Sequence, residues 1–457
     1  MKLLYYFVLG VVMLMGCSSC EDNEVISFSE QPESSNVKRE IILNYISRVH
    51  STDTRSAEIF LSPYIVDKDT IFYVVNYPEG GFEIFSNNFS LPMVVAKAKN
   101  GYFDPNMLTM TPNPFNTFID EIAHGLSGVG MDEAKEEMNY SWSRFALTSQ
   151  EKNSSEHYVG IACELSEKEY TPKGGRLATK WHQLFPYNQY VPFLEGGSGG
   201  HSYVGCGAIA AGQYIFFSHK YFGNPATTVD KFTYSATSNS FDFYGNSSSV
   251  WNKMDDGSDK SIVSDAERLK PTALFLGYVA NGCCSAYNTT IGDSAGTGTY
   301  RGDVRNFINK ELSSNLQLHA FDILKTIDIL KKGYPVFVSS RGDLYKNGKR
   351  YNGGHDYLID YTLYRIVKYY DVFASSVGGS DAGNEDPDNE YGNNLDYYRD
   401  KYGSISYRET NTIVEYWLSM NWGGGKYDDV LINASLEEWL LKDSSSELHL
   451  FYHEILY

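Results

Sequence analysis

The stretch Tyr203-Val-Gly-Cys-Gly-Ala-Ile-Ala-Ala-Gly-Gln213 decides the fold of this chain, because it predicts a closely packed helix that begins at a cysteine. Its small apolar residues allow a helix to lie against its neighbours at short range. A cysteine at a helix N-terminus feels the positive end of the helix dipole, which favours thiolate over thiol. Since the thiolate is the nucleophile, Cys206 is a candidate catalytic residue, and the alternative is a buried structural cysteine.

Three other segments carry the polar residues that a cysteine nucleophile requires. They are Lys180-Trp-His-Gln-Leu-Phe-Pro-Tyr-Asn188 with Gln183, Gly353-Gly-His-Asp-Tyr-Leu-Ile-Asp360 with His355, and Glu415-Tyr-Trp-Leu-Ser-Met-Asn-Trp-Gly-Gly-Gly425 with Asn421 and Trp422. We expect His355 to take the thiol proton and later protonate the leaving amine, with the Asn421 side-chain oxygen holding the imidazole. We expect the Gln183 amide and the Cys206 backbone N–H to donate to the oxyanion on the scissile carbonyl.

The order Gln, Cys, His, Asn-Trp in these segments resembles that of the papain-like cysteine peptidases. The fuller wording, W-x-Q-x-x-P-Y-N, G-C-x-A-x-A-x-x-Q, G-G-H-x-x-x-I-D and N-W-G, is similar to that of the streptopain family over most of residues 165–457. These are secreted bacterial cysteine peptidases made as zymogens. The resemblance implies an α+β, papain-like, two-lobed fold, in which a helical lobe with Cys206 faces an antiparallel sheet lobe with His355. It also implies that Trp422 shields the histidine–asparagine hydrogen bond from water.

The chain departs from the family pattern beside its histidine and asparagine. The turn after Asn421 lacks the second tryptophan of the family's Asn-Trp-Gly-Trp-Gly-Gly, and Asp356 stands where the family has a small residue. The Asp356 carboxylate would either raise the pKa of the neighbouring imidazole or point into solvent. The gap between His355 and Asn421 is several times the usual spacing, and the excess is an acidic insert near 364–412. Its turn-forming stretch 378–394 predicts a surface loop.

Other histidines compete for the role of base. His219 lies 13 residues after Cys206, roughly 20 Å further along the axis if both share one helix, so it does not reach the thiol. His201 lies in a glycine-rich loop, which positions a base poorly, and His182 adjoins Gln183 and is expected to point elsewhere. His355 is preferred because a strand holds it rigidly.

The N-terminus predicts secretion. Residues 1–17 carry Lys2, a short apolar run and Leu14-Met-Gly-Cys17, which resembles a bacterial lipobox and implies a membrane anchor through lipid on Cys17. The acidic Glu21-Asp-Asn-Glu24 resembles the surface-export tag of some Gram-negative lipoproteins. We therefore expect a cell-envelope protein, an outer-membrane lipoprotein facing the surface; the alternative is a conventional signal peptide with free secretion.

Residues 18–160 are interpreted as a propeptide that inhibits the catalytic domain, residues 161–457. Ile71 to Ser86 predicts two strands around a Pro-Glu-Gly-Gly turn, a helix is expected near residues 115–124, and 149–156 is a polar linker. We expect cleavage near Lys152 or near residues 173–176. The alternative is a permanent accessory domain.

Composition narrows the range of partners. With 457 residues the chain is long enough for two or three domains, and its net charge of −19 argues against nucleic acid. No cysteine or histidine spacing predicts a zinc site. The carboxylates of the insert suggest calcium, but their spacing does not match the EF-hand pattern. We therefore expect no cofactor or metal. A disulfide from Cys163 to Cys283 or Cys284 is left open.

The leading hypothesis is a lipid-anchored cysteine endopeptidase that acts on peptides or proteins through Cys206 and His355. One alternative is a catalytically silent relative that serves as a surface binding protein. The other is a thiol acyltransferase or amidase on the same scaffold, because the same groups serve any acyl transfer.

Overall fold

The structure is a computed structural model of the whole chain. It describes the following residues: 34–49, 60–89, 91–105, 114–128, 142, 157–223, 232–236, 239–243, 248–259, 265–291, 294–346, 349–374, 395–422, 430–434 and 451–457. The chain divides into two compact units, Met1–Glu40 and Ile41–Tyr457, and the second contains the candidate site. Helix α2 (Ser34–Val49) runs across this division. No helix in the described ranges is long and apolar enough to cross a membrane.

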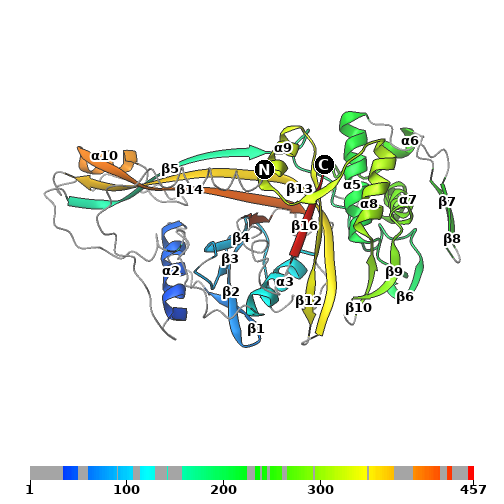
Figure 1. Ribbon diagram of the computed structural model, residues 1–457, viewed down its shortest axis with the longest axis horizontal. Helices are drawn as coiled ribbons and strands as arrows, with labels where there is room; N and C mark the ends of the chain where they lie inside the picture. The colour runs from blue at the N-terminus through cyan, green and yellow to red at the C-terminus, as the bar shows by residue number, and fades with distance from the viewer. Residues whose placement is uncertain are drawn as a thin grey trace, which may run out of the picture. The chain divides into compact units, whose positions relative to one another are not determined.

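Eleven described strands of the second unit form one antiparallel sheet (Figure 1). In spatial order they are β1 (Ser62–Val66), β2 (Asp69–Asn76), β3 (Phe82–Ser86), β4 (Val94–Ala98), β15 (Leu431–Asn433), β14 (Ile405–Asn421), β13 (Lys349–Ala374), β12 (Val336–Lys346), β16 (Phe451–Leu456) and β11 (Leu318–Ala320), with β5 (His157–Tyr170) on β13. The smaller strands are β6 (Phe193–Ser198) and two hairpins, β7 (Phe232–Ala236) with β8 (Asn239–Phe243) and β9 (Ala286–Ile291) with β10 (Ser294–Gly298).

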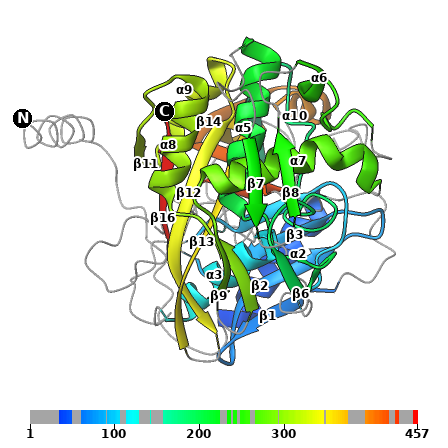
Figure 2. The ribbon, with the colours of Figure 1, turned by 90° about the vertical axis from the view of Figure 1, so that its right-hand side faces the viewer.

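The helical lobe is built around α5 (Cys206–Phe222), which packs against β13 and against neighbouring helices (Figure 2). The other helices of this part are α6 (Ser248–Trp251), α7 (Ala266–Gly282), α8 (Arg301–Leu312) and α9 (Ile323–Lys331). From Gly207 to Ser218 every residue of α5 is buried: small side chains in its first half allow close packing, and the aromatic residues of its second half belong to the core shared with α7. The helix ends at Gly223, whose φ of 65° suits the left-handed cap. The helix predicted to begin at Cys206 is therefore confirmed.

The N-terminal strands and α3 (Pro114–Gly128) share a core with the sheet lobe. Strands β2 and β3 flank the predicted Pro-Glu-Gly-Gly turn and pair from Phe72↔Ser86 to Asn76↔Phe82, as expected from the sequence. The predicted helix near residues 115–124 is confirmed by α3. Among the described residues, the N-terminal strands pair with the rest of the sheet through two residue pairs of β4 and β15, Leu431↔Lys97 and Ile432↔Ala96.

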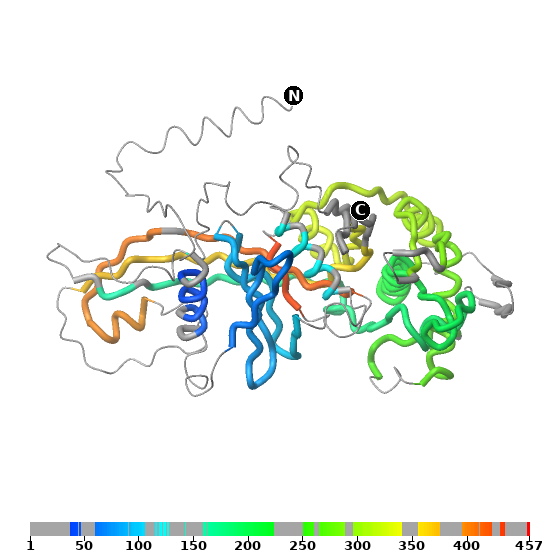
Figure 3. The backbone as a smooth tube through the Cα atoms, turned by 90° about the horizontal axis from the view of Figure 1, so that it is seen from below, coloured from blue at the N-terminus to red at the C-terminus, as the bar shows by residue number. Residues whose placement is uncertain are grey.

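The insert between the histidine and asparagine segments extends the sheet. Beyond Thr362, β13 pairs with β14 on one edge and with β5 on the other, so the three strands form a long ribbon (Figure 3). Helix α10 (Leu395–Tyr402) packs on this ribbon and buries Leu395 and Tyr398 against it. Within 364–412 the described residues are thus strand and helix apart from a short bend at 403–404, and the predicted loop 378–394 lies outside the described residues.

Two large clusters of buried hydrophobic residues lie on opposite faces of β13. One lies between α5, α7, α8 and one face of β13, and the other lies between α3, the N-terminal strands and the opposite face of β13. The α+β class, with a helical lobe beside an antiparallel sheet lobe, is confirmed.

Candidate active site

Cys206 is the first residue of α5 and is half-buried. Gly205 precedes it with a φ of 98°, a conformation that favours glycine, and no side chain caps the helix there. The positive end of the helix dipole at this position favours the thiolate form of a cysteine. A backbone N–H at such a position is the kind of donor that stabilises an oxyanion.

Gln183 lies on the segment that runs beside the start of α5. Its backbone carbonyl accepts a hydrogen bond from Val204 N at 3.2 Å, two residues before the nucleophile. The Gln183 side chain is half-buried. The structure thus brings the predicted oxyanion residue to the start of the cysteine helix.

The three competing histidines are held by other groups. His182 Nδ1 accepts from Leu184 N at 3.2 Å, and burial lowers the His182 pKa to about 4. His201 Nδ1 lies 2.8 Å from the Val191 carbonyl and braces the β6 turn. His219 packs against Trp251 near the far end of α5, with ring centroids 4.4 Å apart and the rings tilted by 38°. None of these contacts directs a ring to Cys206.

His355 lies on β13 and bonds to the backbone of Trp422. Its Nε2 is 3.0 Å from the Trp422 carbonyl oxygen, and the two rings are 6.1 Å apart. Because a carbonyl only accepts, Nε2 carries the hydrogen, and Nδ1 of the neutral ring is the acceptor. This tautomer is assigned from the partner. It leaves Nδ1 as the nitrogen that can take a proton.

Adjacent residues of β13 point to opposite faces of the sheet. Tyr357 belongs to the core cluster with α3, whereas Leu358 belongs to the cluster with α5. By this alternation the His355 ring lies on the α3 face, with Tyr357 at a centroid distance of 6.3 Å. The Asp356 side chain lies on the α5 face, beside the nucleophile helix.

Asn421 lies opposite Leu358 in the register and shares its α5 face. Its Nδ2 donates to the Thr179 carbonyl at 2.9 Å, and Gln213 Nε2 of α5 donates to the same oxygen at 3.4 Å. The described contacts therefore tie Asn421 to α5 through Thr179 and tie His355 to Trp422. The role of Asn421 in holding the imidazole remains a prediction.

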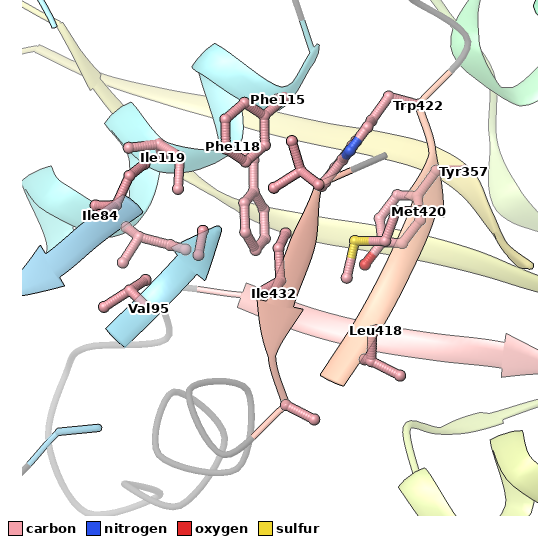
Figure 4. Packing of buried hydrophobic residues seen from close by; sticks show 14 of the residues in the cluster. Ile84, Val95, Phe115, Phe118, Ile119, Tyr357, Leu418, Met420, Trp422 and Ile432 are labelled. Atoms are coloured by element: carbon pink, nitrogen blue, oxygen red, sulfur yellow. The ribbon is translucent and has the colours of Figure 1, made fainter. Parts of the chain in front are cut away.

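Trp422 is packed by the N-terminal helix α3. Its ring lies 5.1 Å from Phe118, 6.0 Å from Phe115 and 4.9 Å from Tyr357, and its exposed fraction is 2% (Figure 4). Trp422, whose backbone carbonyl bonds to His355, is therefore part of a core to which α3 contributes.

Asp356 and Thr299 are site neighbours whose placement the sequence did not reveal. Asp356 is 2% exposed, so the expectation that it points into solvent is wrong. A Cβ built on Gly207 would lie 2.6 Å from Asp356 Oδ2 and 2.2 Å from Thr299 Oγ1. Strand alternation was the signal that could have placed Asp356, since its neighbour His355 was assigned to a strand.

The described cysteines form no disulfide: Cys163, Cys206, Cys283 and Cys284 are thiols. Burial raises the pKa of the Cys283 thiol, and the charge of Asp356 raises it further. Within the described ranges, no three His, Cys, Asp or Glu side chains are grouped as a metal site would require. The acidic stretch in which calcium was considered lies outside those ranges.

Comparison with known proteins identifies the segment that carries the cysteine and histidine. Residues 181–372 match the model of the peptidase C10 family, and this segment contains Gln183, Cys206 and His355. The predicted resemblance to the streptopain family is confirmed over this segment. Asn421 and Trp422 lie beyond it.

Two solved structures are similar to the chain. A Prevotella intermedia prointerpain A fragment, a cysteine-to-alanine mutant, is 16% identical, with a TM-score of 0.49 over 88% of this chain and 98% of that one. Active wild-type interpain A cysteine protease from Prevotella intermedia is 18% identical, with a TM-score of 0.36 over 63% of this chain and 94% of that one. Likenesses this distant carry no weight for the function of this chain. No curated protein matches it in sequence.

Proposed function

We propose that this chain is a cysteine endopeptidase made as a zymogen, in which Cys206 is the nucleophile and His355 is the base. The observation that carries the proposal is Cys206 itself, which starts a buried helix behind an uncapped glycine within the peptidase C10 segment. The thiolate attacks the scissile carbonyl, the C–N bond breaks as the protonated imidazole donates to the leaving amine, and an acyl-enzyme remains. Water then hydrolyses this thioester and restores the thiol.

The N-terminal segment is the proposed inhibitor. Helix α3 packs Phe115 and Phe118 on Trp422, whose carbonyl holds His355 Nε2 on the face of β13 away from α5. Removal of α3 would uncover Trp422 and allow the imidazole to turn toward Cys206. Release of the N-terminal segment would also break the β4–β15 pairing, which consists of two residue pairs among the described residues.

Maturation by cleavage before β5 agrees best with the contacts on either side. Strand β5 pairs with β13 from His157 to Tyr170, so it is part of the catalytic sheet. Of the two expected cleavage regions, residues 173–176 are held in place: Lys173 N donates to the Gly333 carbonyl at 2.8 Å, and Arg176 Nε lies 3.6 Å from Asp360 Oδ1. Lys152 lies outside the described residues.

The cellular location is proposed from the sequence. A lipobox-like Leu14-Met-Gly-Cys17 supports lipid on Cys17 and attachment to the cell envelope, with release after processing as the alternative. Metabolic labelling with a fatty acid tests this step, because a Cys17→Ser chain would take up none.

The experiment that tests the activity is product analysis on an unfolded protein substrate. The matured protein should cleave internal peptide bonds and incorporate ¹⁸O from labelled water into the new carboxyl groups, and Cys206→Ser should do neither. Products joined to an added amine, with no hydrolysis, would instead support the acyltransferase reading. Retained binding to an intact ligand by Cys206→Ser, with no cleavage by either form, would support the binding-protein reading.

A further inference from the structure

Asp356 places a carboxylate behind the nucleophile. The side chain is buried on the α5 face of β13, and its Oδ2 lies 2.6 Å from the point that a Gly207 Cβ would occupy. A Cα–Cβ bond adds about 1.5 Å, so this oxygen lies within about 4 Å of the Gly207 Cα. Since adjacent Cα atoms are 3.8 Å apart, the carboxylate lies within about 8 Å of the Cys206 Cα.

We propose that Asp356 is a positioning residue that sets the pH at which Cys206 becomes a nucleophile. This inference rests on the proposed function, because it concerns the same thiol. A carboxylate opposes a second negative charge nearby, so it delays formation of the thiolate to higher pH. The positive end of α5 stabilises both anions, and the two therefore share one electrostatic environment.

The same position explains why glycine follows the cysteine. Asp356 Oδ2 and Thr299 Oγ1 both lie within 2.6 Å of the absent Cβ, which places them less than about 5 Å from one another. Any other residue at 207 would displace one of them. Gly207 thus allows the carboxylate to approach the first turn of α5.

Other titratable groups that the structure describes near this end of α5 lie on β13, α7, α8 and the Gln183 segment. Strand β13 presents Asp356 on the α5 face and His355 on the opposite face, while β12 and β10 present Ser339 and Thr297. Cys283 follows the end of α7. Burial raises the pKa of its thiol most, the charge of Asp356 raises it next, and Asp303 and Glu311 of α8 raise it further. His182 lies on the Gln183 segment and is neutral near pH 7, since its pKa is lowered to about 4.

The test is the pH dependence of Cys206 alkylation by iodoacetamide in the full-length chain. Peptide mapping by mass spectrometry separates Cys206 from Cys284, which is exposed and also reacts. Unit charges about 8 Å apart at an effective dielectric constant of about 20 shift a titration by about 1.5 pH units. Asp356→Asn should therefore move the midpoint roughly one to one and a half units lower, because loss of the anion favours the thiolate.

Asp360→Asn is the matched control. Asp360 is a buried carboxylate on the same strand and face, roughly 13 Å further along β13, where it accepts from Leu177 N at 2.9 Å. Its removal should leave the Cys206 midpoint in place. Asp356→Ser, a smaller neutral side chain, should shift the midpoint in the same direction and covers the case in which the asparagine variant does not fold.

The outcomes separate the inference from the function beneath it. An unchanged midpoint in both Asp356 variants, with Cys206 still alkylated, would overturn the role of Asp356 and leave the peptidase intact. An equal shift in Asp360→Asn would also overturn it, because the effect would then be general. Failure of Cys206 to react in the wild-type chain, before and after removal of the N-terminal segment, would count against the proposed function itself.

Discussion

Neighbouring residues on β13 serve different faces of the molecule. His355 lies with Trp422 and Tyr357 on the α3 side, and Asp356 lies against Gly207 at the start of α5. A strand gives this separation without any change of backbone, because its side chains alternate. The cysteine helix and the histidine ring therefore lie on opposite faces of one strand, and each face belongs to a different core.

Gly207→Ala tests the close approach at the nucleophile. The new methyl group would meet Thr299 Oγ1 at 2.2 Å and Asp356 Oδ2 at 2.6 Å, so the first turn of α5 must shift. Overpacking of this kind costs about 1–3 kcal/mol of folding stability. We expect alkylation of Cys206 at least ~10-fold slower, a factor that corresponds to ~1.4 kcal/mol. The matched control is Gly212→Ala on the same helix, whose methyl meets the flexible end of Leu276 at 2.9 Å and the rings of Phe275 and Trp181 at an ordinary 3.6 Å. Equal alkylation rates in the two variants would contradict the account.

Sequence patterns predicted residue types better than residue partners. Gln183 and Cys206 were predicted to lie together, and the Val204–Gln183 backbone hydrogen bond brings their segments into contact. The hydrogen bond from His355 to the Trp422 carbonyl was not predictable. Every residue has a backbone carbonyl, so a sequence motif does not indicate which one accepts a hydrogen bond. Asp356 was noticed as a departure, but its burial follows from the helix packed over β13.

At the scale of elements, α3 is the part that joins the N-terminal segment to the site. Its apolar side chains fill the space between the N-terminal strands and Trp422, and Phe118 is 4% exposed. The helix was predicted from the sequence, but its position on the tryptophan was not, because that contact links residues about 300 positions apart. Long-range packing of this kind depends on the sheet order, which no local pattern contains.

Phe118→Ala should weaken the hold of α3 on Trp422. Truncation of a buried phenylalanine costs about 3–5 kcal/mol. In the uncut chain we expect Cys206 to react several-fold faster with an epoxysuccinyl inhibitor, because His355 is released with Trp422. Leu126→Ala is the matched control, since Leu126 is buried on the same helix (3% exposed). Its truncation destabilises α3 but removes no aromatic ring that packs on Trp422. If the leucine variant activates the chain as much as the phenylalanine variant, the Trp422 contact is not the restraint.

The packing of α3 should also depend on pH. Hydrogen bonding to Asp120 raises the pKa of His124 above its usual value, despite an opposing effect of burial. A raised pKa means that the protonated ring stabilises the folded state below the unfolded pKa of about 6.5, and that this stabilisation is lost as pH rises through the higher folded pKa. In a Cys206→Ser background, the loss of thermal stability between pH 6 and pH 8 should therefore be smaller in His124→Gln than in the parent. His319→Gln, which removes an exposed histidine, should behave like the parent. An identical pH dependence in all three would exclude a contribution from His124.

At the scale of the whole molecule, one sheet runs through the N-terminal strands and the catalytic strands, but it is not equally strong throughout. Strands β13 and β5 share thirteen residue pairs, whereas β4 and β15 share two among the described residues. Strand patterns and turn residues predicted strands in both halves of this sheet. Their junction and the long ribbon were not predicted, because pairing partners are set by topology.

The position of cleavage follows from these unequal junctions. We expect Edman sequencing of the matured protein to give an N-terminus upstream of His157, so that β5 stays with β13. A mature chain that begins after Arg176 would have lost both β5 and the Arg176–Asp360 ion pair, and it would contradict this account of maturation.

The most direct measurement is the intact mass of the full-length chain after incubation with an epoxysuccinyl cysteine-peptidase inhibitor, beside Cys206→Ala and Cys284→Ala. The account predicts a single adduct that is kept in Cys284→Ala and lost in Cys206→Ala. It also predicts that untreated chain loses its N-terminal segment only when Cys206 is present. No adduct on Cys206, even after another protease has removed the N-terminal segment, would contradict the assignment of Cys206 as the nucleophile of a cysteine peptidase.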